Sequence, residues 1–280
     1  MAEICGPYIY MEEIKSVKTW KTGHAGRVRR WIRTLLSFAF AERKCICCGG
    51  DCYDMPLCGK CAGERILSDP LRSFARCRIC GRILLGQKET CTACRTECVL
   101  GGTDGVIALF PYRQWRKKLL FDWKMSNERS LSLLFARAAA RGLESAGLDP
   151  ESCVIVPVPP RPGKIRSKGW DQVDELCRMI ASLYGYSMLR LLKRFSSEQQ
   201  KKKDRRGRFL SRDSVYGISP KCGRELAKWA KSRGKCGEIP ETAVIVDDVI
   251  TTGNTVAGCA EKIKGLGIRK VKVLSLFIVD

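Results

Sequence analysis

Residues 243–255 read AVIVDDVITTGNT and are the most informative stretch of the chain. Its first residues form a continuous apolar run, which is typical of a strand covered on both faces. Two adjacent carboxylates end the run, and a short turn of Thr and Gly then opens a helix. Backbone amides at such a helix start point outward, and the helix dipole favours negative charge there. The stretch therefore predicts a strand–turn–helix unit with an anion site beside two acids.

The residues of this unit suit two different parts of one ligand. Gly253 lets the backbone approach a phosphate closely, and the neighbouring threonines offer hydroxyl donors. Asp247 and Asp248 repel a phosphate but accept hydrogen bonds from the hydroxyls of a sugar. A phosphate on one side and a diol on the other describe a ribose 5-phosphate. A plain strand end followed by a helix-capping turn is the alternative interpretation.

Strands and helices alternate through the rest of the C-terminal part. Continuous apolar runs predict strands at residues 106–110, 154–158, 243–246 and 271–279. Helical spacing of apolar residues predicts helices from Trp115, from Leu131, after a capping Asp171 and over 254–266. This alternation indicates an α/β fold with a mostly parallel sheet and flanking helices. The polar, basic stretch from Arg194 to Gly237 is typical of a solvated loop.

Residues 45–98 hold most of the cysteines and few core-forming residues. Four CxxC pairs are present: Cys45 and Cys48, Cys58 and Cys61, Cys77 and Cys80, and Cys91 and Cys94. Two thiolates at this spacing can face one tetrahedral ion, and two pairs complete a site of four sulphur ligands. We therefore expect one or two structural zinc ions, which fit better than an iron–sulphur cluster or a redox motif. Whether the pairs combine in chain order or interleave stays open.

Composition narrows the classes of function. With 51 Lys and Arg against 29 Asp and Glu, the formal net charge is +22, which favours polyanionic partners. His24 is the single histidine, so a catalytic triad that uses a histidine base is not expected. The sequence shows neither an export leader nor an apolar run of about 20 residues, and we expect a cytoplasmic protein without a transmembrane segment. Residues 27–42 predict a basic amphipathic helix that packs on its own domain, with a peripheral membrane or DNA contact as the alternative.

Two stretches resemble a known family. AVIVDDVITTGNT resembles the signature of type I phosphoribosyltransferases, and VPVPPRPGKIRSKGWDQ, residues 156–172, resembles a segment of the ComF family. Arg194, Gln199 or Gln200, and Arg205 resemble the basic motif that follows in that family. Four cysteine pairs ahead of such a domain also fit, and the likeness covers about residues 29–280. Lys168 and Asp171 depart from the family's usual Arg and Asn.

The resemblance implies a type I phosphoribosyltransferase-like fold preceded by a small zinc-ribbon module. We therefore expect three parts: an N-terminal extension with a basic amphipathic helix (1–44), the cysteine-rich zinc-ribbon module (45–100) and the phosphoribosyltransferase-like domain (101–280). The resemblance also implies a ligand, phosphoribosyl pyrophosphate (PRPP), bound with Mg²⁺. The implied PRPP-binding residues are Asp247, Asp248, Thr251, Thr252, Gly253, Asn254, Thr255, Pro159 and Pro160. The implied catalytic residues are Asp247, Asp248, Arg194 and Arg205.

In function, the resemblance implies the import of single-stranded DNA during natural transformation, together with other competence proteins. A phosphoribosyl transfer would expel pyrophosphate from C1 of the sugar. No proton acceptor or acceptor substrate is identifiable in the sequence, so turnover stays open. The alternative hypothesis is an accessory protein without turnover that binds single-stranded DNA or senses PRPP.

Overall fold

The structure is a computed structural model that describes residues 43–53, 55–68, 75–84, 86, 89–96, 100–165, 169–195 and 215–279. Its centre is a five-stranded sheet in which every neighbouring pair is parallel. The strands, in spatial order, are β3 (Val106–Pro111), β9 (Lys270–Ile278), β8 (Thr242–Ile250), β4 (Val154–Pro157) and β5 (Ser187–Met188). The predicted α/β fold with a mostly parallel sheet is therefore confirmed.

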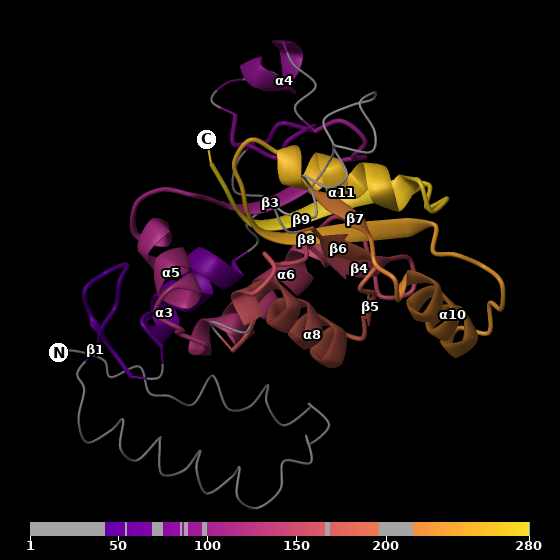
Figure 1. Ribbon diagram of the computed structural model, residues 1–280. Coiled ribbons are helices and arrows are strands. Elements are labelled where there is room, and N and C mark those ends of the chain that lie inside the picture. Colours follow the sequence, from indigo (N-terminus) through magenta and orange to yellow (C-terminus); the bar gives the residue numbers. More distant parts are fainter. Residues whose placement is uncertain are drawn as a thin grey trace, which may run out of the picture.

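Helices cover both faces of this sheet (Figure 1). One face carries α5 (Trp115–Lys124), α6 (Ser130–Ser145) and α8 (Gln172–Tyr184). The other face carries α11 (Asn254–Lys264) and an antiparallel strand pair, β6 (Leu192–Arg194) and β7 (Tyr216–Ile218). A further helix, α10 (Cys222–Ser232), lies beside β5, where Arg233 at its end donates a hydrogen bond to Ser187 Oγ at 3.2 Å.

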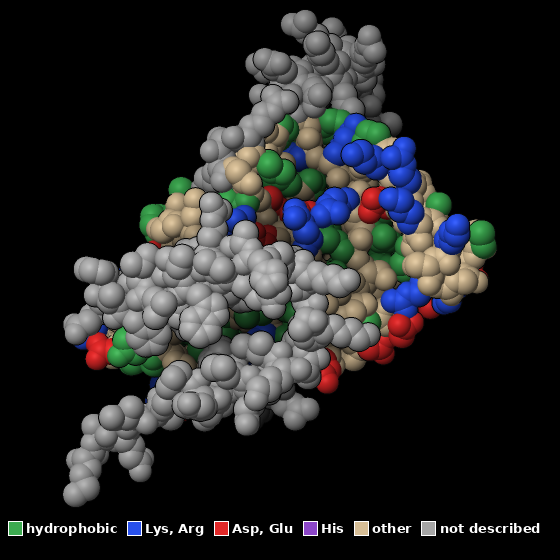
Figure 2. All heavy atoms as spheres, turned by 90° about the horizontal axis from the view of Figure 1, so that it is seen from below, with side chains coloured by type: hydrophobic (Ala, Val, Ile, Leu, Met, Phe, Trp, Pro, Cys, Tyr) green, Lys and Arg blue, Asp and Glu red, His purple; other side chains and the backbone are tan. Residues whose placement is uncertain are grey.

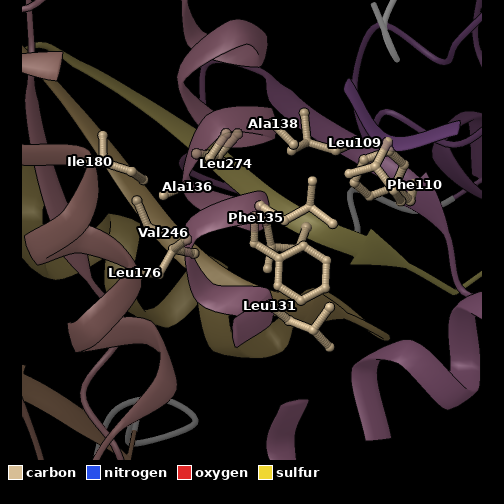
Figure 3. Close-up of a cluster of buried hydrophobic side chains, with 14 of the residues drawn as sticks. Leu109, Phe110, Leu131, Phe135, Ala136, Ala138, Leu176, Ile180, Val246 and Leu274 are labelled. Carbon is tan, nitrogen blue, oxygen red and sulfur yellow. The ribbon is translucent and has the colours of Figure 1, made fainter. Parts of the chain in front are cut away.

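The sheet is buried on both sides because successive apolar residues of its central strands point to opposite faces. Along β8, Val244 and Val246 point to the α6 and α8 face, whereas Ala243 and Ile245 point to the α11 face. Figure 3 shows Val246 and Leu274 from the sheet packed among side chains of α6 and α8, including Phe135. A continuous apolar run is what a strand in this position needs.

The cysteine-rich part consists of short elements on both sides of the sheet. β1 (Arg43–Lys44), β2 (Asp51–Cys52), α3 (Gly59–Ala62) and the π-helix η2 (Gly63–Leu67) lie on the α5 and α6 side. α4 (Thr92–Thr96) lies on the α11 side (Figure 1). The two halves of this part therefore contact opposite faces of one sheet.

Two expectations need correction. The basic stretch was expected to form one solvated loop, but residues 215–237 contain β7 and α10. The helix forms because Cys222, Leu226, Trp229 and Ala230 share one face of it, an apolar period within a basic composition. The strand at residues 243–246 also extends to Ile250, because β9 continues to pair with it.

Two predicted features lie outside the described residues: the basic helix at 27–42, and Arg205 with the neighbouring basic run. Within the described ranges, no helix combines the length and apolar character needed to cross a bilayer.

Candidate functional site

The two carboxylates lie at the point where the sheet loses one neighbour of β8. Val246 pairs with Pro157, the last residue of β4, whereas β8 continues along β9 to Ile250. Asp247 and Asp248, in β8, therefore lie just beyond the end of the neighbouring strand β4, at the carboxyl edge of the parallel strands. This edge is where ligands bind in open α/β sheets.

Asp247 and Asp248 have different surroundings. Asp247 is half-buried and accepts a hydrogen bond from the Asp248 backbone N–H at 2.8 Å. Burial and then the adjacent charge of Asp248 raise the pKa of Asp247 to about 8. The buried Asp248 instead has an ion-pair partner, because Lys124 Nζ lies 2.7 Å from its Oδ2. At neutral pH the pair therefore carries one retained proton and one neighbouring cation.

Lys124 was not predicted as a site residue. It ends α5, and its backbone carbonyl accepts a hydrogen bond from Gln172 Nε2 at 2.9 Å. This bond joins the end of α5 to the start of α8. A lysine in the last helical turn usually interacts with the negative end of the helix dipole and with solvent. Its position in the sequence therefore does not indicate the contact with Asp248.

The segment after β4 brings a further acid and a further lysine to the site. Asp171 caps α8 by accepting a hydrogen bond from Asp174 N at 3.0 Å, as predicted. Lys164 Nζ lies 2.9 Å from Asp171 Oδ1 and 2.5 Å from Gln172 Oε1. The charge of Asp171 also contributes to the raised pKa of Asp247, so both acids face one site. Pro159 and Pro160, the implied pyrophosphate neighbours, are half-buried at the start of this segment.

The phosphate turn, which we define as residues 251–253, joins β8 to α11. Thr251 and Thr252 are exposed, and Gly253 is buried with φ of 80°. A residue with a Cβ is strained at that angle. The first N–H groups of α11, which begins at Asn254, have no partner within the helix. The turn therefore has the backbone shape that an anion site requires.

Thr255 and Arg194 meet at one aromatic ring. Burial raises the pKa of Tyr216, and a hydrogen bond with Thr255 opposes this effect. The guanidinium carbon of Arg194 lies 5.3 Å from the centre of the same ring. The structure thus brings Arg194, from β6, to the first turn of α11. Thr255, Arg194 and the charge of Asp247 all act on Tyr216, so these three predicted residues lie near one another.

The cysteines form two groups of four, combined in chain order. The first cysteine group is Cys45, Cys48, Cys58 and Cys61, and the second cysteine group is Cys77, Cys80, Cys91 and Cys94. In each, the sulphur atoms all lie within 4.8 Å of one another. Cys48 and Cys58 Sγ are 3.8 Å apart, and Cys80 and Cys91 Sγ are 3.6 Å apart. A tetrahedron with zinc–sulphur bonds of about 2.3 Å has edges of about 3.8 Å, so both groups fit a zinc ion.

The acidity of the thiols leads to the same conclusion. Burial raises the pKa of Cys45 and of Cys77, but backbone N–H groups of the knuckles outweigh burial and bring both values to about 6. Burial and the neighbouring sulphur atoms raise the pKa of Cys61 and Cys94. Four sulphur atoms this close cannot all be thiolates without a cation between them.

Gly49 and Gly81, which follow two of the pairs, both have φ of 75°.

Comparison with known proteins finds similarity to a curated protein. The chain is 25% identical over 225 residues to "Competence protein ComFC" of Streptococcus pneumoniae (strain ATCC BAA-255 / R6). The aligned region covers 80% of this chain and 88% of the relative. No family model matches the chain. Together with the motifs at residues 156–172 and 243–255, this likeness supports membership of the ComF family.

Proposed function

We propose that this protein binds PRPP, or a related ribose 5-phosphate ligand, together with Mg²⁺. One observation carries the proposal: Asp247 and Asp248 lie where β4 ends, and the phosphate turn follows three residues later in the same unit. Acids suited to sugar hydroxyls and amides suited to a phosphate therefore share one edge of the sheet. Mg²⁺ would neutralise the pyrophosphate, because a hard cation prefers oxygen ligands.

Each residue has a distinct part in this proposal. The phosphate turn and the first turn of α11 hold the 5-phosphate, and the two acids accept hydrogen bonds from the ribose hydroxyls. Lys124 leaves Asp248 when the sugar arrives and turns toward the pyrophosphate, which offers it a stronger negative charge. The proton that Asp247 holds near pH 7 is released as Mg²⁺ and PRPP bind.

In the cell, we propose a role in DNA uptake during natural transformation. The relative's name describes a competence protein, and the net charge of +22 suits contact with nucleic acid. Other competence proteins and a cytoplasmic location belong to the same proposal. So does the division of the chain into an extension (1–44), a zinc module (45–100) and a ligand-binding domain (101–280).

Transfer chemistry is a finer hypothesis than binding. In that reaction the bond from C1 to the pyrophosphate oxygen breaks, and an amine or base forms the new bond at C1. Asp247 and Asp248 would orient the sugar, and Arg194 would steady the leaving pyrophosphate. The acids and the phosphate turn that carry the proposal account for binding of the ribose 5-phosphate, so binding is the function that we propose.

Titration calorimetry with PRPP and Mg²⁺ tests this proposal. We expect wild type to bind and the Asp247→Asn, Asp248→Asn double variant to lose at least about 100-fold in affinity, as two hydrogen-bonded charges are removed. Asp51→Asn serves as the control, because it removes a carboxylate from an exposed ion pair that is distant in sequence from Asp247 and Asp248. In wild type, the binding heat at pH 7 should depend on the buffer, because a proton is released. Equal binding by all three proteins, or none by wild type, contradicts the proposal.

A second candidate is a protein that binds single-stranded DNA without turnover. Cations lie over half-buried aromatic rings at two places: the guanidinium carbon of Arg116 is 4.7 Å from the Trp115 ring centre, and Lys117 Nζ is 5.7 Å from the Tyr112 ring centre. Figure 2 shows Lys and Arg side chains grouped around acidic ones on the visible described surface. Such pairs can stack nucleobases. Binding of single-stranded DNA that weakens steeply with salt supports this candidate, whereas weak binding with a flat salt response argues against it.

A further inference from the structure

The second cysteine group lies directly against the phosphate turn. Cys80, Cys94 and Arg82 line one small void of about 10 Å³ together with residues 251–253. That volume is at the lower limit for a single water molecule. The turn that would hold a phosphate and the ligands of one proposed zinc ion are therefore packed together.

The second group is also fixed rigidly to the sheet. A Cβ on Gly81 would lie 3.0 Å from the Val106 carbonyl oxygen and would be strained at φ of 75°, so glycine suits this close approach to β3. Arg76 donates hydrogen bonds to the Gly81 and Ala108 carbonyl oxygens at 3.0 and 2.7 Å. The knuckle thus has a defined position relative to the strands and can act as a fixed support.

Arg82 connects this support to the phosphate turn. It follows the Cys77 and Cys80 knuckle, and its Nε donates to the Val279 carbonyl oxygen at 3.1 Å. Its Nη2 lies 3.5 Å from the Thr251 carbonyl oxygen. Val279 N donates in turn to Ile250 O at 2.9 Å. One guanidinium therefore joins the knuckle, the last strand and the first residue of the turn.

The first cysteine group provides a natural contrast. Cys45 and Cys61 are buried with Leu57 and Ile66 in the cluster on the α6 face, away from the α11 face that carries the phosphate turn. Two metal groups of the same chemistry thus differ in one respect. The second shares a void with residues 251–253, whereas the first packs in the cluster on the opposite face of the sheet.

We propose that the second cysteine group, through Arg82, positions the phosphate turn, so that metal binding there and ligand binding at the turn strengthen each other. Arg82 is a positioning residue in this account, because it acts on the turn backbone. The coupling to a ligand rests on the proposed function; the ordering of the turn by Arg82 does not.

Hydrogen–deuterium exchange on the ligand-free, zinc-loaded chain tests the ordering. The reporter is the Ala257 N–H, which donates to the Gly253 carbonyl oxygen at 2.9 Å. We expect Arg82→Ala to raise its exchange rate about tenfold, because the turn opens locally. Arg78→Ala is the matched control: it removes an arginine of the same knuckle whose partner is the exposed Glu89, and should change the rate by less than about twofold.

PRPP titration on the same proteins tests the coupling. Arg82→Ala should weaken PRPP binding about fivefold or more, the lower range for coupled sites, while Arg78→Ala matches wild type. Arg82→Lys keeps the charge but has one donor nitrogen, so a weakened affinity there shows that geometry matters rather than charge. Full rescue by Arg82→Lys, or unchanged exchange in Arg82→Ala, overturns the proposal. If wild type fails to bind PRPP while Arg82→Ala still loosens the turn, only the proposed function fails.

Linkage requires the reverse effect on the metal. Cys48→Ser leaves the second group intact, and Cys94→Ser leaves the first intact. PRPP with Mg²⁺ should slow zinc transfer to a colorimetric chelator about fivefold in Cys48→Ser and leave the rate in Cys94→Ser unchanged. Equal slowing in both variants, or in neither, contradicts the coupling.

Discussion

Asp247→Asn should make the ligand-free protein more stable and worse at binding. The Asp247 carboxyl has a pKa of about 8, against an ordinary value of 3.8, because of burial and the charge of Asp248. Between about pH 4 and about pH 8, the folded state therefore still holds a proton that the unfolded state has already released. The free energy of unfolding must fall as pH rises through that window and level off above it.

The size of the effect follows from this difference. At about 1.4 kcal/mol per pH unit, the interval from 3.8 to about 8 sets an upper limit of about 6 kcal/mol. Asp247 is half-buried, so water screens part of this cost and we expect a gain of about 2 kcal/mol at pH 8. Asparagine carries no proton to lose, and its amide oxygen can still accept the hydrogen bond from Asp248 N.

Urea unfolding at pH 4.5 and pH 8 measures this effect. The free energy of unfolding of Asp247→Asn should exceed that of wild type at pH 8 and equal it at pH 4.5. For Asp51→Asn it should equal that of wild type at both pH values. A destabilised Asp247→Asn protein at pH 8, or a pH slope equal to that of wild type, refutes the electrostatic argument. A stability gain with a loss of PRPP affinity is the pattern expected of a strained binding site.

Three further predictions concern the surroundings of the site. Lys124→Met should lower the free energy of unfolding by about 1–3 kcal/mol, because it leaves Asp248 buried without its cation, whereas Lys118→Met at an exposed pair should cost under about 0.5 kcal/mol in the same urea assay. Gly253→Ala should cost about 1–2 kcal/mol and weaken PRPP binding about tenfold in calorimetry, since φ of 80° strains a Cβ, while Gly265→Ala, at φ of −62°, should do neither. Metal analysis should find two zinc ions per chain, and a strong chelator should lower the unfolding temperature by about 10 °C or more; one ion or none per chain would contradict the assignment.

Features encoded in local sequence were the most predictable. Continuous apolar runs identified the strands because both faces of this sheet are covered, and Asp171 identified the start of α8 because its carboxylate caps the first turn. The CxxC spacing identified all eight thiols of the two groups. In each case the physical requirement acts within a few residues.

Features that depend on distant residues were not predictable. The ion pair of Lys124 with Asp248 joins positions far apart in the chain, and nothing beside Lys124 indicates it. The extension of β8 past the acids depends on β9 alongside it. The placement of the two cysteine groups on opposite faces depends on which core each half contacts. Such arrangements follow from tertiary packing.

The central claim is that the acids of β8 and the phosphate turn together hold a ribose 5-phosphate. A crystal structure of the full chain with PRPP and Mg²⁺ tests it most directly. We predict the 5-phosphate on the backbone N–H groups around Gly253, the ribose hydroxyls on Asp247 and Asp248, and Lys124 moved away from Asp248. A ligand bound elsewhere, with the ion pair of Lys124 and Asp248 intact, would contradict the account.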